Sequence, residues 1–108
     1  MHAYCTTLHP LCLCAGDFVD RGSWGLEVLM LLGAWQLALP QSVTLLRGNH
    51  ESATCTAAYG FQGELMAKYG CDAQRLYNAA ERVFTSLPLA AHVAGVVPLP
   101  ITAYSCHA

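Results

Sequence analysis

The stretch Gly16-Asp17-Phe18-Val19-Asp20-Arg21-Gly22 decides the fold, together with Leu45-Leu46-Arg47-Gly48-Asn49-His50-Glu51 further along the chain. Each stretch follows a short apolar run, at about 11–15 and 42–46, and such runs predict buried strands. The residues between them predict one helix, from a Ser23 N-cap to about position 39. A β-α-β unit of this kind places both strand ends at one edge of a parallel sheet, where ligands bind in open α/β folds.

The composition is unusually apolar for a chain of 108 residues, which has room for one domain at most. Hydrophobic residues make up 55% and charged residues only 11%, against roughly a quarter in ordinary domains. We therefore expect apolar faces that other protein segments cover. The net charge of −2, without a basic run, argues against nucleic acid or an acidic membrane surface as a partner. The apolar stretch 26–39 is shorter than the ~20 residues of a membrane span and predicts a buried helix.

The six cysteines form no C-x-x-C pair and no zinc-like spacing, and no secretory signal precedes them. Reduced thiols and a cytoplasmic or nuclear location are the favoured interpretation. Cys12 and Cys14 share one face of the first predicted strand. They could in principle bind a metal ion, but apolar filling of a core is the favoured role.

The second half of the chain predicts a helix over 56–69 that ends at Gly70, a helix over 72–86, and a strand over 92–97. In the first helix the predicted buried stripe is Leu26, Leu29, Met30, Gly33 and Leu37. The helix over 56–69 has Tyr59, Leu65 and Tyr69 among its predicted apolar contacts. The helix over 72–86 has Leu76, Ala79, Ala80 and Val83 on one side.

Asp17 is the first candidate for chemistry. A carboxylate at the end of a buried strand is costly unless it is paired or bound to a metal ion. A turn or helix-capping aspartate is the alternative. The side chains of both stretches offer oxygen and nitrogen ligands for hard or borderline divalent ions.

The two stretches at this separation resemble the PPP-type metal-dependent serine/threonine protein phosphatases. Tyr59-Gly60-Phe61-Gln62-Gly63-Glu64 and Leu87-Pro88-Leu89-Ala90 fit that family in order and spacing. Trp24-Gly25-Leu26-Glu27 and Lys68-Tyr69-Gly70 are most similar to the plant and algal phosphatase 7 branch, with phosphatase 5 next. The resemblance implies an α/β fold, a partial calcineurin-like metallophosphoesterase fold with a β-α-β unit, following helices and an incomplete sheet.

The implied boundaries are an unmatched N-terminal segment (1–10), a fragment of the metallophosphoesterase catalytic domain (11–94) and an unmatched C-terminal tail (95–108). The family opens with a Gly-Asp-x-His-Gly motif, which gives an Asp and a His to the first metal ion. Residues 1–15 contain His2 and His9 but no Asp. We therefore expect a truncated chain that is inactive as written, whose partners are a phosphoprotein substrate and the missing portions of its own catalytic domain.

The resemblance also implies a role for each motif residue. Asp17 would bridge two metal ions (manganese, iron or zinc), and Asn49 would give its carbonyl oxygen to the second. His50 would protonate the leaving oxygen, while Asp20 fixes its tautomer.

Arg21 would bind the substrate phosphate. Tyr59 would approach the substrate, although core packing is nearly as well supported. Arg47 and Glu51 are expected to tie the turns together by hydrogen bonds.

The expected function is hydrolysis of phosphoserine and phosphothreonine by a hydroxide that two metal ions activate. Two alternatives remain open: a non-catalytic fragment derived from a phosphatase, and a metallophosphoesterase that acts on small phosphoesters.

Overall fold

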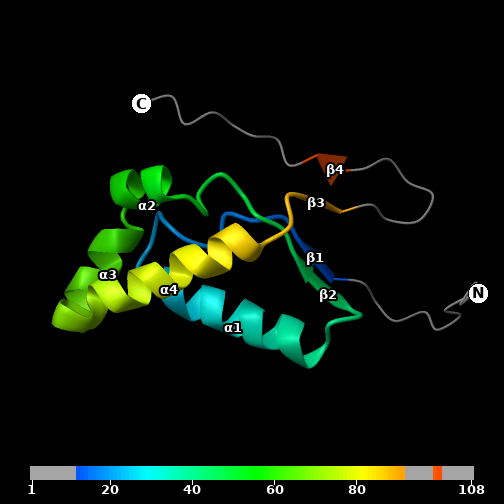
Figure 1. Cartoon of the computed structure of the whole chain (residues 1–108), viewed down its shortest axis with the longest axis horizontal. Coiled ribbons are helices and arrows are strands. Elements are labelled where there is room, and N and C mark those ends of the chain that lie inside the picture. The colour runs from blue at the N-terminus through cyan, green and yellow to red at the C-terminus, as the bar shows by residue number, and fades with distance from the viewer. Residues whose placement is uncertain (1–11, 92–98, 101–108) are drawn as a thin grey trace, which may run out of the picture.

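The structure, a computed structural model, describes residues 12–91 and the backbone of 99–100 (Figure 1). In chain order its elements are β1 (Cys12–Cys14), α1 (Gly25–Ala38), β2 (Val43–Leu45), α2 (Ala53–Tyr59), α3 (Phe61–Tyr69), the 3-10 turn η1 (Gly70–Asp72), α4 (Ala73–Ser86), β3 (Ala90–Ala91) and β4 (Leu99–Pro100).

The predicted β-α-β unit is confirmed. β1 and β2 are parallel neighbours, with Cys14 opposite Leu45, and α1 forms the crossover between them. The sheet has two strands in the described part of the chain, in agreement with the expected incomplete sheet. β3 pairs with β4 in a separate antiparallel pair. The strand predicted over 92–97 lies outside the described residues.

Two hydrophobic clusters form the core, and Phe18 contacts both. The larger cluster joins α1, α3 and α4, and the smaller one lies on β1 and β2. Their buried members are Val19, Leu29, Phe61, Leu65, Ala73, Tyr77, Ala80 and Phe84 in the first, and Val43, Leu45 and Leu87 in the second. Because Phe18 lies directly after Asp17, this packing fixes the loop that carries the first motif.

The single helix predicted over 56–69 is wrong, because Gly60 divides it into α2 and α3. Gly60 has φ +122°, a conformation that only glycine adopts at little cost. The earlier start of α2 comes from Ser52, whose hydroxyl accepts a hydrogen bond from the Cys55 N–H at 3.3 Å. The break directs α3 back across the start of α1.

The prediction that Ser23 caps α1 is also wrong. Trp24 is the N-cap residue, and its side chain makes no capping hydrogen bond. The first amides of α1 are bound instead by Glu64 of α3, a long-range contact that no local pattern indicates.

The predicted buried faces of the helices are only partly correct. In α1, Leu29 is buried but Leu37 is 85% exposed. In α4, Ala80 is buried while Val83 is exposed, and the buried face is completed by Tyr77 and Phe84. In the stretch 56–69, Leu65 is buried, whereas Tyr59 and Tyr69 are exposed.

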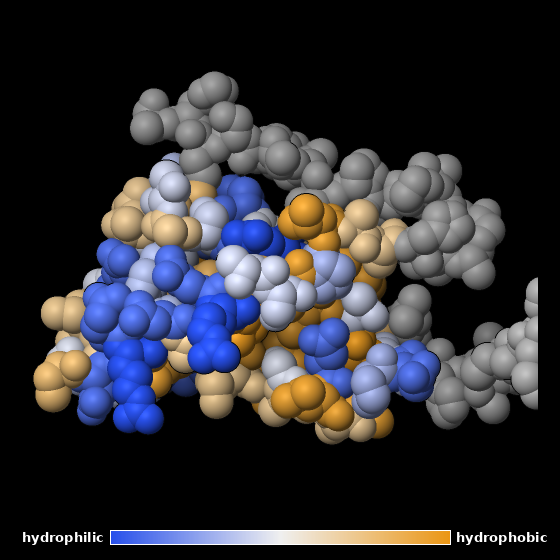
Figure 2. Space-filling model, viewed as in Figure 1, coloured by the Kyte–Doolittle hydropathy of each residue, from blue (hydrophilic) through white to orange (hydrophobic). Residues whose placement is uncertain are grey.

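Apolar side chains of α1 and α4, most of them at least partly exposed, line a groove of about 330 Å³. Figure 2 shows apolar residues along the lower edge of the molecule, over α1, whereas the side of α4 that faces the viewer is largely hydrophilic. The lining residues are Leu26, Leu29, Met30, Gly33, Ala34, Leu37, Leu76, Ala79, Ala80 and Val83. In the part of the chain that the structure describes, no helix is both long and apolar enough to cross a bilayer.

The oxidation state of the cysteines agrees only partly with the expectation that all of them are reduced thiols. Cys12, Cys14 and Cys71 carry free thiols, whereas Cys55 is disulfide-bonded. The Cys12 and Cys14 sulfur atoms lie 4.0 Å apart and pack against the β-strand cluster. Burial, followed by the hydrogen bond with Cys12, raises the pKa of the Cys14 thiol.

Candidate active site

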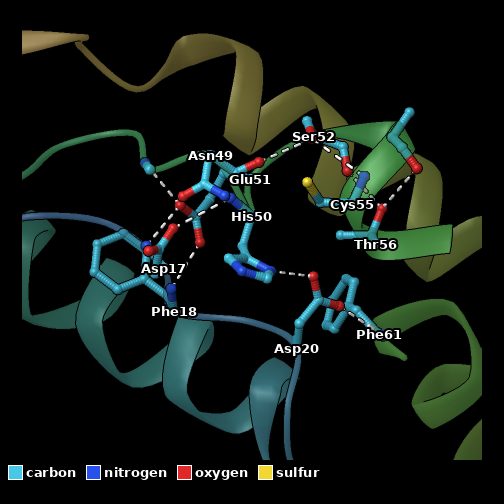
Figure 3. A network of polar contacts seen from close by, with 12 residues as sticks. Asp17, Phe18, Asp20, Asn49, His50, Glu51, Ser52, Cys55, Thr56 and Phe61 are labelled. Carbon is cyan, nitrogen blue, oxygen red and sulfur yellow. Dashed lines mark hydrogen bonds and ion pairs between the residues drawn. The ribbon is translucent and has the colours of Figure 1, made fainter. Parts of the chain in front are cut away.

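The two sequence motifs come together at the carboxyl ends of β1 and β2, as their spacing predicts (Figure 3). Two glycines allow this approach. A Cβ atom on Gly16 would lie 2.2 Å from the Gly48 nitrogen, and one on Gly48 would lie 2.3 Å from Asp17 Oδ1. A side chain at either position would therefore separate the turns.

Glu51 joins the two turns through a fully buried carboxylate. Its Oε2 accepts hydrogen bonds from the N–H groups of Asp17 (2.8 Å) and Gly48 (2.7 Å), and its Oε1 accepts one from Phe18 N–H (2.7 Å). Arg47 Nε donates to the backbone oxygen of Glu51 at 2.9 Å. These contacts agree with the structural role expected for Glu51 and Arg47.

Asp20 and His50 form a buried pair. His50 Nδ1 lies 2.7 Å from Asp20 Oδ2, and the Asp20 side chain is fully buried. The second carboxylate oxygen, Oδ1, accepts a hydrogen bond from Phe61 N–H at 2.9 Å, so the start of α3 orients Asp20. A carboxylate at Nδ1 leaves Nε2 as the ring nitrogen that can face a substrate.

Arg21 and Tyr59 lie beside this pair. The His50 and Tyr59 rings meet edge to face, with centroids 5.2 Å apart. The Arg21 guanidinium carbon is 5.8 Å from the centroid of the Tyr59 ring, and both side chains are exposed. The half-exposed Tyr59 ring therefore lies between the exposed Arg21 side chain and the buried His50 ring, which departs from the alternative of core packing.

Asp17 and Asn49 are the candidate metal ligands. Asp17 Oδ1 accepts a hydrogen bond from the His50 backbone N–H at 3.1 Å, which places Asp17 beside the Asn49-His50 turn. Both side chains carry oxygen donors suited to hard divalent ions. Among residues 12–91, no cluster of three or more His, Cys, Asp and Glu side chains could hold a metal ion. Asp17 and Asn49 thus fit as part of a ligand set.

Two contributors to the site were not assigned such a role from the sequence: the Phe61 amide and the Glu64 carboxylate. Both belong to the stretch from Tyr59 to Glu64. The family resemblance includes this stretch, but the sequence did not indicate what Phe61 and Glu64 do in the structure. Glu64 lies in the first turn of α3, where an acidic side chain is favoured, and this signal after Gly60 could have located the start of α3.

Comparison with known proteins agrees with this geometry. The family model for calcineurin-like phosphoesterases matches residues 9–107. Serine/threonine-protein phosphatase 7 of Arabidopsis thaliana is 48% identical over 82 residues, which cover 76% of this chain and 20% of that protein. Human serine/threonine-protein phosphatase 5 is 45% identical over 82 residues, covering 76% and 16%.

A solved structure shares the fold. It is a Saccharomyces cerevisiae protein serine/threonine phosphatase with similarity to human phosphatase PP5, at 45% identity and a TM-score of 0.68, covering 74% of this chain and 24% of that one. The chain thus spans a fifth or less of the length of the curated relatives cited here. Taken with the Asp17, Asp20 and His50 geometry, the match over nearly the whole sequence shows that this chain belongs to the calcineurin-like phosphoesterase family, as a fragment of its catalytic domain.

Proposed function

We propose that this chain forms part of the catalytic core of a metal-dependent protein serine/threonine phosphatase. The observation that carries the proposal is the buried Asp20–His50 pair beside Asp17, at the ends of two parallel strands. Proteins named serine/threonine-protein phosphatase 7 and 5 match 82 residues of the chain at 48% and 45% identity.

The proposed substrate is a phosphoserine or phosphothreonine side chain of a protein. Two bound metal ions, held in part by Asp17 and Asn49, would supply an activated water molecule and neutralise charge on the phosphoryl oxygens. Manganese, iron or zinc would suit these oxygen ligands and the nitrogen ligands of the family.

The chain's own residues would divide the remaining work. Arg21 offers a planar pair of N–H donors to the phosphate oxygens, and Tyr59 supports the guanidinium from one side. As the bond between phosphorus and the serine oxygen breaks, His50 donates a proton from Nε2 to that oxygen. Asp20 holds the opposite ring nitrogen, so the imidazole keeps its orientation. The free thiols of Cys12, Cys14 and Cys71 support a proposed location in the cytoplasm or nucleus.

A hybrid enzyme tests the proposal. Residues 12–91 would replace the matching segment of the catalytic domain of human phosphatase 5, and release of phosphate from a phosphoserine peptide would be measured with added Mn²⁺. We expect an active hybrid, and we expect His50→Ala and Asp17→Asn each to lower kcat at least 100-fold, on the order of a lost general acid or metal ligand. Arg21→Gln should raise KM and lower kcat, whereas the matched surface change Arg82→Gln should alter neither.

The same assay separates the alternatives. A folded, metal-loaded hybrid that released no phosphate from any substrate would contradict the proposal and favour a non-catalytic fragment. Hydrolysis of small phosphoesters without hydrolysis of the peptide would favour the small-molecule alternative. Activity of the 108-residue chain by itself would refute the expectation that it is inactive as written.

A further inference from the structure

The loop between β1 and α1 carries Asp17, Asp20 and Arg21, and its far end is held by a carboxylate from α3. Glu64 Oε2 accepts a hydrogen bond from Gly25 N–H at 3.0 Å, and Oε1 accepts one from Leu26 N–H at 3.2 Å. Glu64 is only 8% exposed. We propose that Glu64 is a positioning residue for Asp20 and Arg21, an inference that rests on the proposed function.

This loop needs restraint, because three of its residues have an unfavourable backbone conformation. Asp17, Asp20 and Arg21 have φ values of +58°, +71° and +55°. Such left-handed conformations are costly for arginine and less so for aspartate, and three within five residues persist only where surrounding contacts enforce them. The loop therefore depends on contacts at both of its ends.

Glu51 restrains the near end, through the amides of Asp17 and Phe18. The far end is restrained by the first turn of α3. Phe61 N–H donates to Asp20 Oδ1, and Glu64, less than one helical turn later, binds the start of α1. The same turn of α3 thus holds Asp20 directly and holds the end of the loop through Glu64.

The contact between Glu64 and α1 is built at close range. A Cβ atom on Gly25 would lie 2.9 Å from Glu64 Oε2 and 3.1 Å from a ring carbon of Phe61. An alanine at position 25 would therefore displace the Glu64 carboxylate or the Phe61 ring, whereas glycine leaves room for both. The positive end of the α1 dipole adds to the attraction of the negative charge.

Lys68 ties the carboxylate to the surface side of the same loop. Its Nζ lies 3.0 Å from Glu64 Oε1 and donates to the Ser23 backbone oxygen. The same Nζ lies 4.8 Å from the centre of the Trp24 ring. The Glu64–Lys68 pair of α3 therefore holds residues 23–26 in place. The consequence is that loss of the Glu64 carboxylate releases the loop beyond Arg21 and, through it, the Asp20–His50 contact.

Nuclear magnetic resonance on the full ¹⁵N-labelled chain tests this inference without any activity measurement. The readouts are hydrogen exchange of the Phe61 amide, which donates to Asp20, and the ring ¹⁵N resonances of His50. In Glu64→Ala we expect protection of the Phe61 amide to fall about tenfold or more, the loss that follows from a weakened charge-assisted hydrogen bond. The ring resonances of His50 should shift in the same variant. For both readouts, Glu64→Gln should give values between those of the wild type and those of Glu64→Ala.

Two further variants keep the test decisive. Gly25→Ala keeps the charge of Glu64 but displaces the Glu64 Oε2 atom from the amides of α1. It should therefore change the Phe61 amide protection and the His50 resonances in the same direction as Glu64→Ala does. Tyr77→Phe removes the buried 2.7 Å contact with Thr56 in the same core, so it lowers stability without touching the loop. It should leave the His50 resonances unchanged.

Three outcomes would overturn the inference. The first is unchanged Phe61 and His50 signals in Glu64→Ala; the second is an equal shift in Tyr77→Phe. The third is a wild-type chain whose Gly25 and Leu26 amides exchange as in an unfolded peptide, because the contacts would then not form. In the hybrid enzyme, Glu64→Gln should lower kcat more than Tyr77→Phe does. An inactive hybrid would refute the proposed function, while the resonance data would still decide the role of Glu64.

Discussion

Replacement of Glu51 by glutamine should destabilise the protein strongly, although the side chain keeps its size. The carboxylate accepts three backbone hydrogen bonds from a fully buried position, two on Oε2 and one on Oε1. Glutamine has one acceptor oxygen and one NH₂ group. In either orientation, the NH₂ group faces at least one backbone N–H group, so that donor points at donor.

The magnitude follows from these contacts. If the amide oxygen takes the place of Oε2, the bonds to Asp17 and Gly48 survive as neutral bonds, each about 1 kcal/mol weaker than the charge-assisted bond. The Phe18 N–H group then becomes a buried, unsatisfied donor, at a cost of ~1–3 kcal/mol. The sum is ~3–5 kcal/mol, a large share of a typical stability of ~5–15 kcal/mol.

Urea unfolding of the hybrid domain, followed by circular dichroism, measures this change in the free energy of unfolding. Glu81→Gln on α4 is the matched control, and it should change that free energy by less than ~0.5 kcal/mol. A loss below ~1 kcal/mol for Glu51→Gln would refute the reasoning, since it would mean that the three hydrogen bonds are not formed together. Phosphatase activity should fall as well, because Asp17 and the Gly48 turn would lose their alignment.

Three further predictions concern packing, pH and surface. Gly48→Ala should destabilise the domain by ~1–3 kcal/mol and abolish activity, because its Cβ would clash with Asp17; Gly33→Ala, which meets nothing within 4 Å in α1, should instead stabilise by ~0.5–1 kcal/mol. The hydrogen bond from Lys68 lowers the pKa of Glu27. The Glu27–Lys68 contact therefore stabilises the fold above the unfolded-state pKa of Glu27, and this stabilisation is lost as the pH falls through the folded-state pKa. At low salt the urea midpoint of the wild type should decline over that range because of this contact, and Glu27→Gln should lack this part of the decline. Leu37→Lys, at a position that is 85% exposed, should reduce self-association of the 108-residue chain in sedimentation experiments without changing the urea midpoint.

The sequence predicted the part of the structure that local patterns control. Short apolar runs followed by glycine-containing turns located β1 and β2, and their separation predicted the parallel crossover that brings Asp17 to the Asn49-His50 turn. What it missed depends on contacts distant in sequence. Ser23 is a good capping residue by type, yet Glu64, 39 residues from Gly25, binds the start of α1.

The buried face of α1 could not be predicted for a related reason. This helix is apolar on nearly all sides, so periodicity could not select the face that meets the core. α4 has polar residues on one side, but Val83 and Ala79 still fall at the groove rather than in the core. An apolar helix surface that its own fold does not cover is the same feature that the low charge content of the chain predicted.

Arg21 offers a way to separate the backbone of the active-site loop from its side chain. With φ at +55°, this residue bears the cost of a left-handed conformation, about 1–2 kcal/mol for a residue with a Cβ atom. Glycine relieves that cost but gains freedom in the unfolded chain, which offsets about half of it. We therefore expect Arg21→Gly to be ~0.5–1 kcal/mol more stable than Arg21→Ala in urea unfolding, although both lack the guanidinium and should lose the same activity in the hybrid. Equal stability of the two variants would show that the loop relaxes away from this conformation, and a higher activity of Arg21→Gly would show that backbone geometry, rather than the phosphate contact, limits the reaction.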